Sequence, residues 1–123
     1  MLYTNSHNKN ASKIHKKVLD YFKREHPEWR VVQEKTIEID GQKLFCDFMC
    51  DQPFKFILEV QGRQHDEFVQ HFHGTMEKFA EQQENDKKKR VWAEMNGYVL
   101  VEIREAEFDA DTLGDTIMGA ICG

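Results

Sequence analysis

A nearly continuous apolar run over Phe54–Gln61 constrains the fold of this 123-residue chain more than any other feature. Five of its eight positions are apolar, namely Phe54, Phe56, Ile57, Leu58 and Val60. A strand with one solvated face alternates apolar and polar residues, whereas such a run suits a central strand covered on both faces. The run therefore predicts an α/β fold with helices on both sides of a sheet. The length predicts a single domain over residues 1–123.

The residues before this run predict one helix and a hairpin. Ala11–Glu25 has the apolar spacing of an amphipathic helix. It is expected to end before Pro27, because the residue that precedes a proline avoids helical angles. Arg30–Ile39 and Leu44–Cys50 are expected to be antiparallel strands joined at Asp40-Gly41, since this tight turn needs the positive φ that glycine supplies. Strict alternation would place Leu44, Cys46, Phe48 and Cys50 on one face of the second strand, and Phe45, Asp47 and Met49 on the other.

The residues after the run predict two helices and one further strand. Gly74–Met95 is expected to be a long helix that stops at Gly97. Tyr98–Ile103 is expected to be a short buried strand, and Asp111 to cap a last helix through Ile121. The order α-β-β-β-α-β-α predicts a mixed four-stranded sheet flanked by helices.

Composition predicts a soluble, cytoplasmic protein. No stretch approaches the roughly 20 apolar residues that a membrane span needs, and the first ten residues lack the apolar run of a secretion signal. Three cysteines, an odd number, argue against a disulfide framework and for a reducing compartment. We therefore expect no membrane association, and either a monomer or a homodimer.

The charge is unevenly distributed along the chain. The net charge of −5 argues by itself against nucleic acid as a partner. Residues 1–35, however, contain eight basic and four acidic residues, against nine basic and eighteen acidic residues in the remainder. A second basic run covers residues 87–90. Each cluster alone is ordinarily a solvated helix face, but together they permit a phosphate-binding surface.

Two carboxylates are the strongest candidates for chemistry. Asp47 and Glu59 lie in apolar strands, where a charged group is costly unless it is paired or holds a metal. Antiparallel pairing across the turn at residues 51–53 would bring them close together. With the main-chain carbonyl of Val60 they would supply the hard oxygen ligands that Mg²⁺ prefers. The alternative is that Asp47 faces solvent and Glu59 pairs with a lysine.

Polar residues follow Glu59 directly, where α/β sheets carry ligands. His65 is a candidate acid or base, because its ordinary pKa lies near neutrality; the alternative is an exposed histidine in a loop over residues 62–73. Asp86 lies within the long helix, where pairing with a nearby lysine on the surface is the simpler explanation.

The spacing of these residues resembles that of the PD-(D/E)XK nuclease superfamily, and in particular the branch similar to very short patch repair (Vsr) endonucleases with their E-D-x-H-D signature. The resemblance spans roughly residues 11–104. The residues that carry it are Asp47, Glu59, Gln61, Gly62, His65, Asp86, Lys89, Gly97, Tyr98 and Leu100. It implies a restriction-endonuclease-like fold.

The resemblance also implies roles for individual residues. Asp47 and Glu59 would bind the metal, His65 would activate the attacking water, and Asp86 would orient it. Two positions depart from the family pattern. Gln61 stands where the superfamily has a lysine, and His15 stands where the family has a glutamate on the first helix. His15 is either a ligand or acid–base group or a helix-surface histidine.

The implied activity is hydrolysis of DNA phosphodiester bonds with Mg²⁺ as the cofactor, or with Mn²⁺ in its place. The residues expected to contact the DNA backbone are Arg63, Lys87, Lys88, Lys89, Lys13 and Lys17. One alternative is a catalytically weak or inactive protein of the same fold that binds DNA or a protein partner. A zinc site of Cys46, Cys50, His71 and His73 is disfavoured, because a strand separates its two cysteines by roughly 13 Å.

Overall fold

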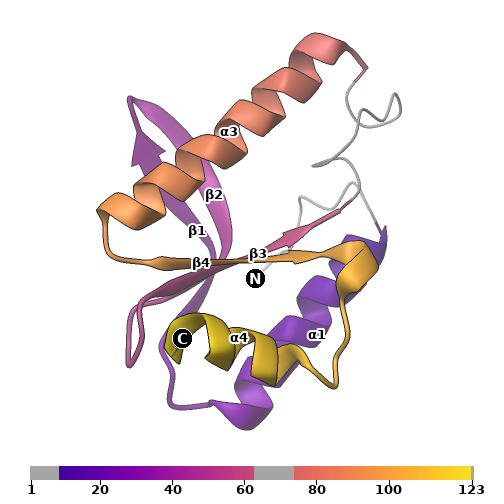
Figure 1. Ribbon diagram of the computed structural model, residues 1–123, viewed down its shortest axis with the longest axis vertical. Helices are drawn as coiled ribbons and strands as arrows, with labels where there is room; N and C mark the ends of the chain where they lie inside the picture. The colour runs from indigo at the N-terminus through magenta and orange to yellow at the C-terminus, as the bar shows by residue number, and fades with distance from the viewer. Residues whose placement is uncertain (1–8, 63–73, 123) are drawn as a thin grey trace.

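The structure is a computed structural model that describes residues 9–62 and 74–122. Its elements follow the expected order, with one short 3₁₀ turn added before the last helix (Figure 1). They are α1 (Lys9–Glu25), β1 (Val31–Ile39), β2 (Gln42–Cys50), β3 (Phe56–Gln61), α3 (Met76–Met95), β4 (Val99–Arg104), η2 (Glu105–Glu107) and α4 (Leu113–Cys122). The α/β class and the order of helices and strands are therefore confirmed.

The four strands form one mixed sheet in the order β1-β2-β3-β4. The pairs β1–β2 and β2–β3 are antiparallel, and β3–β4 is parallel. The parallel pairing is possible because α3 brings the chain back to the end of the sheet at which β3 begins, so that β4 runs in the same direction beside it. All six residues of β3 are buried, as expected for a central strand covered on both faces.

Helices cover both faces of the sheet (Figure 1). On one face, α1 and α4 pack over a core that includes Val18, Phe48, Phe56 and Ile117, none of which is exposed. On the other face, Ala93 and Trp92 of α3 pack over a smaller cluster around Ile57. The two-sided core accounts for the continuous apolar run in β3. Along the residues described, none of the helices combines the length and apolar character needed to cross a membrane.

The strict alternation expected along β2 is wrong. Leu44 and Cys46 pack on the α3 side, but Phe48 packs on the α1 side and Met49 on the α3 side. The change occurs at Asp47, which lies opposite Glu34 in a gap between two paired stretches of β1 and β2. Glu34 has a φ of 50°, in the left-handed region. The hairpin twists at this point, so the side chains before and after it that share one alternation pack on opposite sides of the sheet.

The end of α3 agrees with the sequence prediction, whereas the start of α4 differs from it. Thr75 caps α3 through a bond from the Lys78 backbone N–H, and Gly97 follows the helix with a φ of 77°, as expected. The last helix begins at Leu113 rather than directly after Asp111. Asp111 instead donates its backbone N–H to the Asp109 carboxylate, within a turn that precedes the helix.

Candidate functional site

The candidate site lies where β2 and β3 stop pairing through their backbones. Backbone pairing covers three positions and ends at Phe48↔Leu58. At the next position Asp47 donates its backbone N–H to Oε2 of Glu59 at 2.6 Å, and Val60 donates its backbone N–H to Oδ2 of Asp47 at 2.8 Å. Two carboxylates thus take the place of carbonyl oxygens between the strands. The expected proximity of Asp47 and Glu59 is observed.

Glu59 also holds the ammonium group of Lys89, which reaches it from α3. Nζ of Lys89 lies 2.7 Å from Oε1 of Glu59. The two side chains are only 15% and 7% exposed, so this is a buried ion pair. The alternative in which Glu59 pairs with a lysine is therefore present in the structure. It does not exclude a binding role, because buried pairs contribute little net stability.

The charges around this pair do not cancel. Burial and the negative charge of Asp47 raise the pKa of Glu59 to about 7, against the opposing effect of Lys89. For Lys89, burial lowers the pKa but the attraction of Glu59 outweighs it, so the pKa is raised. Two carboxylates face one ammonium group, which leaves a negative excess when both acids are ionised. Such an excess favours a further cation.

The raised pKa of Glu59 predicts how the stability of the metal-free protein depends on pH. From about 4.5 to about 7 the folded state keeps a proton that the unfolded state has lost. The free energy of unfolding from this group should therefore fall as pH rises through that window. Urea unfolding in EDTA at several pH values measures it. The double variant Glu59→Gln/Lys89→Met should lack this component, and an unchanged slope in that variant would contradict the prediction.

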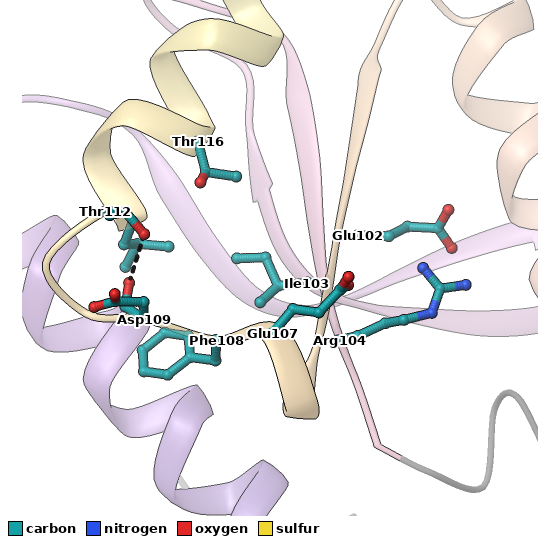
Figure 2. A pocket seen from close by; sticks show the side chains of 9 residues that line it. Glu102, Ile103, Arg104, Glu107, Phe108, Asp109, Thr112 and Thr116 are labelled. Atoms are coloured by element: carbon teal, nitrogen blue, oxygen red, sulfur yellow. Dashed lines mark hydrogen bonds between the residues drawn. The ribbon is translucent and has the colours of Figure 1, made fainter.

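Gln61 points to the neighbouring strand β4. Its Nε2 donates to Oε2 of Glu102 at 2.6 Å, and Arg90 of α3 donates to both oxygens of the same carboxylate at 3.1 and 2.9 Å. Figure 2 shows Glu102 and Ile103 on opposite sides of β4, with Ile103 toward α4. Because the amide nitrogen of Gln61 is turned toward Glu102, its carbonyl oxygen remains as an acceptor.

His15 is buried, with 2% exposure, so the alternative of a helix-surface histidine is wrong. Its ring stacks on Phe48 at 4.3 Å between centroids, and its Nε2 lies 3.2 Å from Oε1 of Gln33. Burial lowers the pKa of His15, while Gln33 and the charges of Glu34 and Glu59 oppose this. The ring therefore lies within electrostatic range of Glu59 and favours its neutral form.

Asp86 is buried on α3, so the explanation of a surface acid is wrong. Its negative charge contributes to the raised pKa of Arg90 one turn later, after the bond to Glu102. Asp86 and Lys89 are three positions apart, so they share a face of the helix. This face is turned toward the sheet, because Lys89 reaches Glu59 from it.

The residues expected to contact DNA differ in their surroundings. Lys13, Lys17 and Lys87 are exposed. Lys88 is half-buried and donates to Oε1 of Gln42 at 3.0 Å. Lys89 is committed to Glu59 rather than presented on the surface. Arg63 and His65 lie outside the described residues, and the DNA contacts remain predictions.

Other metal arrangements find no support. Cys46 and Cys50 are both buried, but they belong to the cores on opposite sides of the sheet. They therefore cannot hold one zinc ion together, and His71 and His73 lie outside the described residues. Within residues 9–62 and 74–122, no group of three or more His, Cys, Asp or Glu side chains is placed to hold a metal ion. At the β2–β3 junction the described residues bring together two carboxylates, Asp47 and Glu59.

A separate hollow of about 150 Å³ lies between the end of β4 and α4 (Figure 2). Its lining includes the acids Glu102, Glu107 and Asp109 beside Arg104. The hydroxyl of Thr112 donates to the Asp109 carbonyl at 3.4 Å, which closes the turn there. The Glu102 side chain lies on the side of β4 away from α4, and the remaining acids Glu107 and Asp109 do not suit a phosphate group, so we assign no role to this hollow.

Comparisons of the chain with protein-family models, with curated proteins and with solved structures found no match. A functional assignment therefore depends on the site geometry and on the sequence resemblance. Among the residues predicted to contact the DNA backbone, Lys89 is placed differently, because it contacts the buried Glu59. Its spacing from Asp86 was the signal that could have placed it at the carboxylates.

Proposed function

We propose that this protein is a Mg²⁺-dependent DNA endonuclease of the PD-(D/E)XK type, similar to the Vsr-like branch, that hydrolyses phosphodiester bonds in the cytoplasm as a monomer or homodimer. The observation that carries the proposal is the pair of hydrogen bonds between β2 and β3, from the Asp47 N–H to the Glu59 carboxylate and from the Val60 N–H to the Asp47 carboxylate, at the point where backbone pairing ends. There, carboxylate oxygens instead of backbone carbonyl oxygens accept the N–H groups between the two strands, inside a largely apolar sheet. Such an arrangement is costly unless a cation offsets it.

The chemistry of the site fits Mg²⁺. This ion takes oxygen ligands, is commonly bound through one or two carboxylates, and keeps several waters. Asp47 and Glu59 would be the carboxylates, and the carbonyl of Val60 a further oxygen ligand. The ammonium group of Lys89 already occupies a cation position on Glu59. Mn²⁺ would use the same oxygen ligands.

Each residue then has a task in the reaction. When bound, Mg²⁺ would polarise a phosphoryl oxygen and stabilise charge on the leaving oxygen. Asp47 and Glu59 hold negative charge at one point between the strands. Gln61, fixed by Glu102, presents an acceptor oxygen that could orient a water molecule. His65 is proposed to accept the proton of the attacking water, with Asp86 orienting it.

The direct test is incubation of supercoiled plasmid with the purified protein and either Mg²⁺ or Mn²⁺. We expect relaxed or linear product, and we expect EDTA to prevent its formation. A mobility-shift assay on the same DNA separates binding from cleavage. Binding without product at any metal concentration would overturn the assignment as an enzyme.

The second candidate is a protein of the same fold that binds DNA or a protein partner without efficient cleavage. The observations that favour it are the two departures from the family pattern, His15 and Gln61. Gln61 donates to Glu102 and lacks the ammonium of a lysine. His15 carries no negative charge in either protonation state, unlike the glutamate that the family has at this position. The plasmid and mobility-shift assays distinguish the two candidates.

A further inference from the structure

The candidate metal site already contains a positively charged side chain, that of Lys89. Nζ of Lys89 contacts Oε1 of Glu59, while Oε2 of the same carboxylate accepts the backbone N–H of Asp47. Both oxygens of Glu59 are therefore engaged. A divalent ion held by Asp47 and Glu59 would share a carboxylate oxygen with an ammonium group, and the two cations would repel each other strongly in a buried site.

We propose that Lys89 is an exchangeable counter-ion, which leaves Glu59 when a divalent ion binds and then contacts a DNA phosphate. The inference rests on the proposed metal site. It reconciles the family-like position of Lys89 beside the carboxylates with its expected role at the DNA backbone. Lysine suits such an exchange, because its ammonium is a compact charge on a flexible four-carbon stem.

The neighbouring contacts allow the side chain to move without moving α3. Lys88 donates to Gln42 on β2, and Arg90 donates to Glu102 on β4. Ala93, one turn further along, is buried against the sheet. These contacts anchor the helix on both sides of Lys89. The side chain of Lys89 retains 15% exposure.

The exchange couples the metal and the DNA energetically. The metal must displace Lys89, which weakens metal binding in the absence of DNA. Once displaced, the ammonium group is available to a phosphate, which strengthens DNA binding. Since such coupling is reciprocal, DNA must strengthen metal binding by the same factor.

Chemical labelling of the wild-type protein tests the exchange without any variant. Acetic anhydride labelling is compared by mass spectrometry in EDTA and in saturating Mn²⁺, without DNA. We expect labelling of Lys89 to rise at least about fivefold with Mn²⁺, at the low end of usual coupling. Lys88, whose ammonium contacts Gln42 instead, serves as the internal control and should remain unchanged.

Metal affinity gives a second measurement. By calorimetry at pH 8.5, Lys89→Met should bind Mn²⁺ at least about fivefold more tightly than the wild type, because no ammonium group then has to be displaced. Lys88→Met should bind like the wild type. Unchanged Lys89 labelling together with equal affinities would overturn the exchange but leave the metal site intact. Absence of Mn²⁺ binding to the folded wild-type protein would instead overturn the proposed function itself.

Discussion

Replacing Asp47 with asparagine is expected to lower metal-dependent DNA cleavage by more than about 100-fold while leaving the domain folded. Loss of groups that merely orient metal ligands costs roughly 10–100-fold, and loss of a charged ligand should cost more. The amide oxygen of asparagine can still accept the Val60 N–H, which Asp47 now accepts at 2.8 Å. The variant therefore removes charge and keeps the hydrogen bond between the strands. Plasmid nicking rates and urea unfolding measure the two effects.

A matched control is available in the turn that follows β2. Asp51 pairs with Arg30 at 2.6 Å on the surface, where the two side chains are 40% and 62% exposed. Asp51→Asn removes the same charge from the protein and should leave the nicking rate unchanged. Wild-type cleavage by Asp47→Asn, in a preparation shown to be free of contaminating nuclease, would contradict the metal-ligand role. Equal losses in both variants would point to overall charge instead.

The sheet and the carboxylate pair were predictable because local patterns specify them. The apolar run of β3 required cover on both faces, and the Asp40-Gly41 turn, with φ values of 50° and 78°, set the hairpin. Antiparallel pairing of consecutive strands then brought Asp47 opposite Glu59. Each step depends on residues close together in the sequence, for which periodicity and turn chemistry are informative.

The features that escaped prediction depend on tertiary contacts. The exchange of faces in the hairpin occurs at Glu34, and a positive φ at a glutamate has no sequence signal. The bond from Gln61 to Glu102 joins residues 41 positions apart on parallel strands. His15 stands in α1 between Ile14 and Lys16, with further lysines at positions 13 and 17. Phe48 nevertheless stacks on its ring, and Gln33 lies within hydrogen-bond distance of it. Helical spacing places His15 on the same face as Val18 and Phe22, three and seven positions later, but it does not predict the contact with Gln33.

Replacing Lys89 with methionine is expected to destabilise the metal-free protein by about 3–5 kcal/mol above neutral pH, the usual result of removing one partner of a buried ion pair. Glu59 would then be left ionised and buried without its ammonium partner. Loss of Lys89 also raises the pKa of Glu59 further, because Lys89 now lowers it. At acidic pH the variant can protonate Glu59 and avoid the penalty. The loss relative to wild type should therefore grow with rising pH, as urea unfolding in EDTA at pH 5 and pH 8 would show.

The double variant Glu59→Gln/Lys89→Met decides whether the loss comes from the unpaired charge or from packing. It removes both charges and keeps side chains of similar size, and replacement of a whole buried pair is often neutral or stabilising. We therefore expect the double variant to recover most of the stability at pH 8. Lys87→Met, at an exposed position on the same helix, controls for the methionine itself. A double variant as unstable as Lys89→Met would show that the stem of Lys89, rather than its charge, stabilises the junction of α3 with the sheet.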